Sequence, residues 1–336
     1  MRFFRMAAIA VVAAASFLIP QTVASAATPS GLLPTLALPR NVAIGGTDAS
    51  FPEALVTSMS SPAKNPSGAN DWACKPSTAH PYPVVLVHGT WENAYDNWNG
   101  LSQILKYYGY CVFAVNYGNT SGIPFLNGTG DMVAAANEVA TFVNKVLTTT
   151  KAAKVDLIGH SQGGAQIRYV TNLLGLASKV DQVIAISPSN HPTTLSGITT
   201  LGKQLKLFGV AMDVLNAVQM PAAAQQADQS PKPQAPFYQN LNGKGETVSG
   251  VSYTNILTKY DEVVTPYTLG AITAGAGAKV DNIVIQSVCP IDLSEHLSMS
   301  YSKNVAQIIL NKLDPKDQRP VLCYAQAPLT GSTRLI

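Results

Sequence analysis

The sequence predicts an α/β protein with a mostly parallel central sheet that helices cover on both faces. One indication is the alternation of short apolar runs with helix-length segments from about Trp72 onward. This alternation is typical of an open sheet with right-handed crossovers. Another is that several runs are almost continuously apolar, as strands buried on both faces are. With 46% apolar and 12% charged residues, the 336-residue chain can bury a large core.

Six apolar runs are the predicted strands. They lie at residues 83–87, 111–115, 155–158, 183–186, 251–257 and 283–285. Predicted helices lie between or after them, at 97–106, 162–174 and 302–313 and in a segment that follows Asp131. In that last segment Met132, Val139, Val143 and Val146 recur at helical spacing, and Asp131 suits the first turn of a helix.

The first 26 residues have the pattern of a secretory signal peptide. Arg2 and Arg5 precede an apolar run over residues 6–19, and Ala24–Ala26 places small residues where signal peptidase cleaves. The alternative is a membrane anchor, but the run is shorter than the roughly 20 residues of a spanning helix and Pro20 ends it. We therefore expect cleavage near residue 26 and a secreted, soluble chain.

Composition divides the rest of the chain into two parts. Residues 27–70 are rich in Pro, Ser, Ala and Gly, which predicts an extended arm that wraps the domain or is partly disordered. Residues 71–336 contain the predicted strands and helices, show no internal repeat and are expected to form one domain.

Residues Gly159–Gly163 fit the pattern G-x-S-x-G of a nucleophile turn. The pattern alone is weak, because chance gives it in about one chain in ten of this length. Here it directly follows the predicted strand at 155–158 and begins the predicted helix at 162–174, which is the strand–turn–helix context that the pattern requires. The alternative is an ordinary tight turn with a buried serine. We predict Ser161 as the nucleophile.

A serine nucleophile needs a histidine base and an acid that orients the base, in the chain order Ser, acid, His for this kind of turn. Of the two histidines after Ser161, His191 follows a strand too closely for an acid to precede it, so His296 is the predicted base. Asp261 lies just after the strand at 251–257, where catalytic groups gather in parallel sheets, and is the predicted acid. A turn aspartate is the alternative for Asp261, and two other acids remain as substitutes: Asp292 and Glu262.

Acyl transfer also needs hydrogen-bond donors for the oxyanion. One is expected from the backbone N–H of Gln162, the residue after the nucleophile. The other is expected from the loop after the first strand, at the N–H of Thr90 with help from its hydroxyl. The alternative for His88 and Gly89 in this loop is a plain turn that ends a strand.

Residues Ser189–Lys244, called the insertion below, interrupt the alternation of strands and helices. An apolar stripe at helical spacing is followed by a Gln- and Pro-rich part from Pro221 to Pro236. One interpretation is a core-packing helix and a surface loop. The other is an apolar flap over the active site, with four residues as the wall of an acyl pocket: Leu201, Leu205, Phe208 and Met212.

Four cysteines follow the predicted cleavage site: Cys74, Cys111, Cys289 and Cys323. An even number in an exported chain indicates two disulfides, and three pairings are possible. No C-x-x-C spacing is present, so we expect no metal, and nothing indicates a cofactor. The net charge of +3 without a basic stretch argues against nucleic acid as a partner.

Four stretches resemble those of the class 2 secreted lipases of bacteria, within the α/β-hydrolase superfamily, and the chain is similar to the yeast lipase called lipase B. Pro83–Thr90 resembles the first core strand and oxyanion loop, and Ile158–Gly164 resembles the nucleophile turn. Thr258–Pro266 resembles the acid loop with its D-E-x-V-x-P pattern. Ser287–His296 resembles the histidine loop, with a cysteine seven residues before the histidine.

The resemblance implies an α/β-hydrolase catalytic domain, over residues 71–336, that hydrolyses triacylglycerols or other carboxylic esters with Ser161, Asp261 and His296. It also implies the disulfides Cys74–Cys111 and Cys289–Cys323, of which the second would anchor the loop that carries the base. We expect a hydrophobic ester or lipid substrate and a monomer. The alternatives are a polyester hydrolase or acyltransferase on the same scaffold and an exported binding protein without catalysis.

Overall fold

The computed structural model describes residues 37–207, 209–210, 220–231 and 236–334. The predicted signal peptide therefore lies outside the described residues. So do Phe208 and Met212 of the predicted pocket wall.

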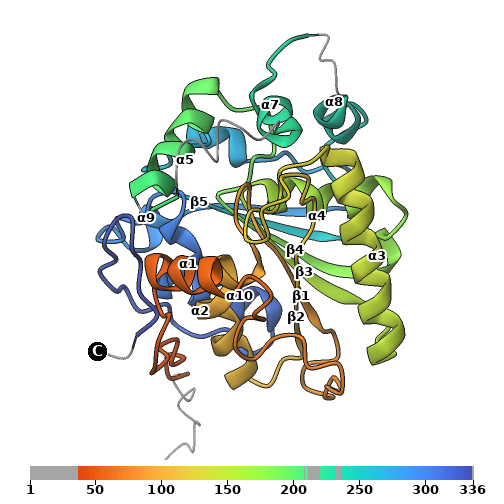
Figure 1. The fold of residues 1–336 in the computed structure, drawn as a ribbon. Coiled ribbons are helices and arrows are strands. Elements are labelled where there is room, and N and C mark those ends of the chain that lie inside the picture. Colours follow the sequence, from red (N-terminus) through yellow and green to blue (C-terminus); the bar gives the residue numbers. More distant parts are fainter. Residues whose placement is uncertain (1–36, 208, 211–219, 232–235, 335–336) are drawn as a thin grey trace, which may run out of the picture. The chain divides into compact units, whose positions relative to one another are not determined.

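In the described part of the chain, six parallel strands form one sheet, which confirms the predicted fold class (Figure 1). The strands are β1 (Val84–Val87), β2 (Val112–Val115), β3 (Val155–His160), β4 (Val180–Ile186), β5 (Ser252–Leu257) and β6 (Lys279–Val284). Their order across the sheet is β2-β1-β3-β4-β5-β6. Val87 pairs with Gly159 and His160 pairs with Ile186, so the carboxyl ends of β1, β3 and β4 meet at one edge. The last predicted strand differs, because β6 begins before it and ends at Val284, where a short helix starts.

Helices cover both faces of the sheet. They are α1 (Phe51–Ser60), α2 (Ala94–Tyr107), α3 (Met132–Thr150), α4 (Gln162–Leu173), α5 (Leu195–Leu207), α7 (Pro221–Ala227), α8 (Phe237–Asn242), α9 (Ile285–Val288) and α10 (Lys303–Leu313). Short 3₁₀ turns lie at Ala177–Lys179, Tyr267–Gly270 and Ser298–Tyr301. Figure 1 shows α3 and α4 on one side of the sheet and α2 and α10 on the other.

Successive side chains of a strand alternate between two separate hydrophobic cores, one on each face of the sheet. Val85 and Val87 of β1 belong to the core beneath α3 and α4. Val84 and Leu86 of the same strand belong to the core beneath α2 and α10. Because successive strand residues point to opposite faces, an almost continuously apolar run is what a strand between two helical layers requires.

The predicted extended arm contains a helix, α1. Pro52 lies in its first turn, where the missing N–H costs nothing. Its buried Leu55 packs into an apolar cluster with Tyr95 of α2, and the Ser58 hydroxyl donates a hydrogen bond to Asp96. Such a short helix depends on packing rather than on its own propensity, which explains the difference from the prediction.

Both disulfides that the resemblance implied are present. Cys74 is bonded to Cys111, the residue before β2. Cys289, just after α9, is bonded to Cys323. Of the described helices, none combines the length and the apolar character needed to cross a membrane.

Candidate active site

Ser161 lies in a sharp turn between β3 and α4, with φ 54° and ψ −121°. A positive φ is strained for a residue other than glycine, and such strain is typical of functional sites. The turn needs the flanking glycines, since a Cβ on Gly159 would lie 2.4 Å from the Gly163 carbonyl oxygen. A Cβ on Gly163 would lie 2.1 Å from the Val87 carbonyl oxygen. The turn therefore presses α4 against two strand ends and fixes the serine at the edge of the sheet.

The structure brings Ser161, His296 and Asp261 together. Ser161 Oγ lies 2.8 Å from His296 Nε2, and His296 Nδ1 lies 2.9 Å and 3.0 Å from the two Asp261 carboxylate oxygens. Asp261 Oδ1 also accepts the backbone N–H groups of Val263 and Val264, at 3.0 Å and 2.8 Å. All three side chains are buried. This geometry allows the imidazole to take the serine proton while the carboxylate orients it.

The surroundings of His296 favour its charged form. Burial lowers the pKa of His296, but the charge and hydrogen bond of Asp261 raise it, with further support from Glu92 and Glu295. The net result is a pKa above the ordinary value of 6.5. An imidazole with a raised pKa is a stronger proton acceptor, and the cation that forms when it takes a proton is stabilised where it stands.

Both predicted oxyanion residues adjoin the serine. A Cβ on Gly89 would lie 3.1 Å from Ser161 Cβ, which places the loop carrying Thr90 against the nucleophile. Within the described residues, neither the Thr90 nor the Gln162 backbone N–H has a hydrogen-bond acceptor. The Gln162 N–H also belongs to the first turn of α4, where helix N–H groups point outward. The site therefore offers two unpaired backbone donors beside Ser161.

A buried polar network behind Ser161 was not predicted from the sequence. Glu92 Oε2 accepts the Gly89 N–H at 3.0 Å and lies 3.1 Å from His160 Nδ1. His160 Nε2 lies 2.9 Å from the His296 carbonyl oxygen and must donate to it, because a carbonyl only accepts. The network thus links the oxyanion loop, the turn and the base. Its only sequence signal was the position of His160 inside the G-x-S-x-G pattern.

The residues considered as alternatives have other partners. Asp292 accepts hydrogen bonds from the side chains of Ser302 and Asn304 and so supports the histidine loop from within. Glu262 accepts one from Gln204 of α5, and burial together with the charge of Glu295 raises its pKa to about 7. His191 lies against Glu246 and the Leu269 carbonyl oxygen.

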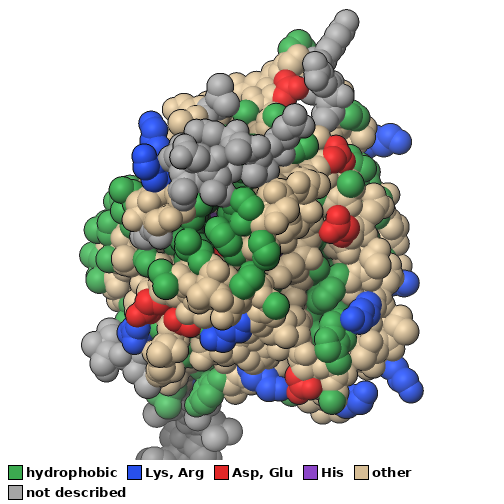
Figure 2. Space-filling view, in the orientation of Figure 1, with side chains coloured by type: hydrophobic (Ala, Val, Ile, Leu, Met, Phe, Trp, Pro, Cys, Tyr) green, Lys and Arg blue, Asp and Glu red, His purple; other side chains and the backbone are tan. Residues whose placement is uncertain are grey.

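Two of the proposed pocket-wall residues belong to an apolar cluster beside the site. Leu201 and Leu205 of α5 are buried in a cluster that also contains Trp91, Val263 and Leu297. These three residues follow the oxyanion loop, the acid and the base along the chain. Figure 2 shows apolar side chains gathered on the face that carries α1 and α5. The apolar cluster of α5 therefore includes chain neighbours of Thr90, Asp261 and His296.

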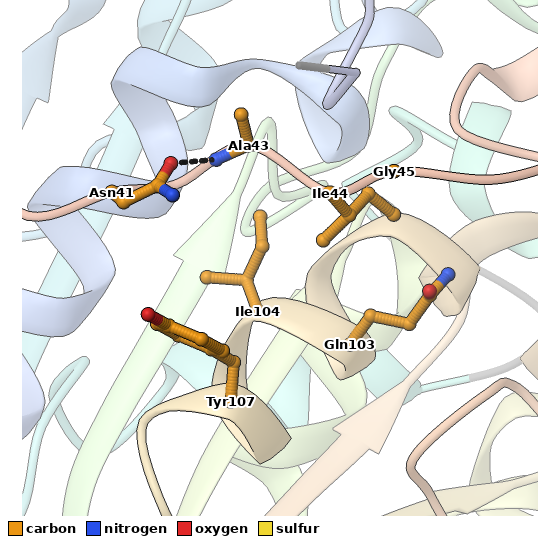
Figure 3. Close-up of a pocket in the computed structure, with 7 residues that line it drawn as sticks. All are labelled: Asn41, Ala43, Ile44, Gly45, Gln103, Ile104 and Tyr107. Carbon is orange, nitrogen blue, oxygen red and sulfur yellow. Dashed lines mark hydrogen bonds between the residues drawn. The ribbon is translucent and has the colours of Figure 1, made fainter.

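A pocket of about 360 Å³ lies elsewhere, between residues 41–45 and the last two turns of α2 (Figure 3). α2 begins near the carboxyl end of β1 and runs back along the sheet, so its last turns lie at the far end from Ser161. The lining includes Ile104 and Tyr107 but no carboxylate, imidazole or amine. This pocket therefore lacks the side chains needed for acid–base chemistry.

Comparison with known proteins identifies the family that this chain resembles. Residues 81–296 match the family model described as lipase (class 2). Over 94 residues the chain is 39% identical to triacylglycerol lipases of Pseudarthrobacter phenanthrenivorans and Burkholderia plantarii, covering 26% of this chain and 28% and 25% of theirs. The matched stretch thus spans about a quarter of these relatives. Lipase B of Aspergillus fumigatus shares the fold, with a TM-score of 0.54 and 19% identity over 73% of this chain and 56% of that one.

Proposed function

This chain belongs to the class 2 lipase family, and we propose that it hydrolyses carboxylic esters, in particular triacylglycerols, through an acyl-enzyme on Ser161. One observation carries the proposal: a continuous hydrogen-bonded line runs from Ser161 Oγ through His296 to Asp261, with no contact longer than 3.0 Å. A line of this kind converts a weakly nucleophilic hydroxyl into one that attacks a carbonyl carbon.

The proposed reaction has two stages. Ser161 Oγ attacks the ester carbonyl carbon while its proton passes to His296 Nε2, and the oxyanion is stabilised by the backbone N–H groups of Thr90 and Gln162. Collapse of the tetrahedral intermediate breaks the bond to the alcohol oxygen, which takes the proton from His296. Water then attacks the acyl-enzyme by the same route and releases the acid. Asp261 orients His296 and stabilises the imidazolium.

The substrate class follows from the apolar surroundings of the site. We place the acyl chain against the insertion, with Leu201 and Leu205 in or directly behind the pocket wall. Phe208 and Met212, which lie on the same stripe in the sequence, are part of the same proposal. Long apolar acyl chains gain more from such a wall than short ones do, because the free energy gained grows with the apolar area buried.

We further propose that the enzyme is exported and acts as a monomer. Two disulfides support export, because disulfides persist mainly in oxidising compartments. The pattern of the first 26 residues supports it independently.

Initial rates on a series of 4-nitrophenyl esters and on emulsified triglycerides test the proposal, with Ser161→Ala as the control. We expect hydrolysis of both substrate types and a loss of roughly 10⁵-fold or more in the variant. Wild-type protein without esterase activity would support the binding-protein alternative. Preferential transfer of the acyl group to an added alcohol would indicate an acyltransferase, and preference for polyester films would indicate a polyester hydrolase.

A further inference from the structure

We propose that Gln226, in α7 of the insertion, is a positioning residue that orients the Thr90 hydroxyl as a third donor to the oxyanion. This inference rests on the proposed esterase function and adds a specific role for the insertion. Gln226 and Thr90 are 136 residues apart along the chain.

The contact between the two side chains is short and buried. Gln226 Nε2 donates to Thr90 Oγ1 at 2.7 Å, and each residue is 1% exposed. Thr90 follows Gly89, where an added Cβ would lie 3.1 Å from Ser161 Cβ. A hydrogen bond shielded from water in this way is not exchanged for solvent, so it sets the direction of the groups that it joins.

The orientation of the Gln226 amide is determined by its other partners. Nε2 also lies 3.2 Å from the Ala222 carbonyl oxygen, which can only accept a hydrogen bond. Oε1 accepts the Ser189 hydroxyl at 3.0 Å. Both hydrogens and the oxygen of the amide are therefore used, and a flipped amide would place its oxygen against the Ala222 carbonyl.

This orientation decides what the Thr90 hydroxyl can do. A threonine hydroxyl donates one hydrogen and accepts through its oxygen. Because Gln226 donates to that oxygen, the Thr90 hydrogen must point elsewhere. In the part of the chain that the structure describes, no protein acceptor receives it. The hydrogen is therefore available to the negative oxygen that forms next to Ser161.

The helix that carries Gln226 is held in place from several sides. The neighbouring Gln225 donates to the Asp131 carboxylate at 2.7 Å and accepts the Met132 N–H at 2.9 Å. The Thr193 N–H donates to the Gln226 carbonyl oxygen at 2.7 Å. These bonds fix α7 to the start of α3 and to the start of the insertion, so Gln226 has little freedom to move away from Thr90.

A double-mutant cycle on the full chain tests the proposal. With 4-nitrophenyl butyrate as the substrate, Thr90→Val should lower kcat by about 100-fold, the usual loss for one oxyanion donor. Gln226→Leu should lower kcat by about 10-fold with little change in KM, because the hydroxyl is no longer oriented. In the Thr90→Val background, Gln226→Leu should change kcat by less than about twofold, because there is no hydroxyl left to orient. An equal loss in both backgrounds would overturn the proposal.

A second variant separates orientation from simple packing. Gln226→Glu keeps the size of the side chain, but a carboxylate accepts the Thr90 hydrogen and withdraws it from the oxyanion. We expect a larger loss of kcat than in Gln226→Leu, whereas a purely structural role predicts that the isosteric change is the milder one. The affinity for a trifluoromethyl ketone inhibitor should fall in parallel with kcat/KM.

Gln229→Leu provides the matched control. Gln229 is another glutamine of the insertion, and its amide donates to the Thr193 carbonyl oxygen at 3.0 Å. We expect the melting temperature of the Gln229→Leu variant to fall, while its kcat changes by less than about twofold. If the wild-type protein has esterase activity that Ser161→Ala abolishes, but the effects of the Thr90 and Gln226 substitutions are additive, the role of Gln226 is rejected and the esterase function stands. Wild-type protein without esterase activity would reject the function and, with it, this role.

Discussion

Two groups of residues meet around Ser161, and they are held in different ways. The first group lies at the ends of the strands and includes Asp261, His160 and Glu92, each fixed by several buried hydrogen bonds to neighbouring backbone or side chains. The second group comes from the insertion, and two of its glutamines reach the site through one side-chain contact each, Gln226 to Thr90 and Gln204 to Glu262.

The difference separates two tasks. The edge of the sheet supplies the reacting groups, and strand register places them because neighbouring parallel strands end together. In our proposal, the insertion adds orientation and apolar surface to a site that already contains the proposed nucleophile, base and acid. Changes in the first group should therefore affect the chemical step, whereas changes in the second should affect selectivity and fine positioning.

The largest effect is expected at the acid. Asp261→Asn presents an amide N–H to His296 Nδ1 and favours the tautomer that cannot accept the serine proton, so kcat should fall by about 10⁴-fold. The substitution also removes the charge that raises the pKa of His296. In wild-type enzyme, activity should be lost as the pH falls through a value above 6.5, and in the variant this limb should move to lower pH. Profiles of kcat/KM against pH check both effects, and an unmoved limb would contradict the role of Asp261.

A smaller effect is expected from Glu92→Gln, which breaks the buried network behind the serine. The free energy of unfolding should fall by about 3 kcal/mol, because His160 and the Gly89 N–H lose a buried charged partner. The matched control is Glu138→Gln, since the exposed Glu138 also accepts a glycine N–H, that of Gly118, at 2.9 Å. Glu138→Gln should lower the free energy of unfolding by less than about 1 kcal/mol. Urea denaturation of both variants gives the comparison, and equal costs would show that burial of Glu92 is unimportant.

A selectivity effect is expected from the insertion. Leu201→Ala should lower the ratio of long-chain to short-chain ester hydrolysis by about 10-fold, because two or three methylene contacts are lost from the pocket wall. Leu55→Ala in α1 changes the same apolar cluster from a different helix and should destabilise the protein without altering the ratio. Rates on 4-nitrophenyl palmitate and 4-nitrophenyl butyrate give the ratio of long-chain to short-chain hydrolysis. An identical ratio in both variants would mean that α5 packs the core only.

The smallest effect is expected where the two groups touch, at Glu262. Its pKa is about 7 in the folded protein and about 4.5 in the unfolded chain, because burial and Glu295 disfavour the charged form. The folded state then binds more protons, so the stability linked to Glu262 is complete below pH 4.5 and is lost as the pH rises through 7. Glu262→Gln should stabilise the protein above pH 7 by on the order of 1 kcal/mol, reduced from the full shift by solvent screening.

Thermal melts of Glu262→Gln and wild-type protein at pH 4 and pH 8 check this sign. The two proteins should melt together at pH 4, and the variant should melt higher at pH 8. A higher melting temperature of the wild-type protein at pH 8 would show that the Gln204 contact outweighs the cost of burying the charge.

The parts of the fold that the sequence predicted are those with local signals. β1 and β2 are continuously apolar, and β4 contains the apolar run Val183–Ile186, because two helical layers bury these strands. The strand predicted at 283–285 covers only the end of β6. This strand is the outermost of the sheet, where the polar residues Lys279, Asp281 and Asn282 are tolerated, and they interrupt the apolar pattern. α1 was missed because its stability comes from contacts with α2, which no local pattern records.

The site divides in the same way. The sequence placed Ser161, His296 and Asp261 because each follows or precedes a recognisable strand or turn, and the structure brings the three together. Gln226 lies in a segment with no strong pattern, and Glu92 contacts His160 across 68 residues. Contacts between residues so far apart in the sequence are determined by the packing of the whole domain rather than by residues that are neighbours in the sequence.

The two ends of the described chain pair with each other. The N–H of Ile44 donates to the Thr333 carbonyl oxygen, that of Phe51 donates to Thr330, and that of Thr333 donates to Ala49. During synthesis the segment that leads into α1 therefore has to wait, without these backbone partners, until residue 333 has left the ribosome. Until then, α1 can pack against α2, which is made early, so the pairing of the two ends is a late step of folding.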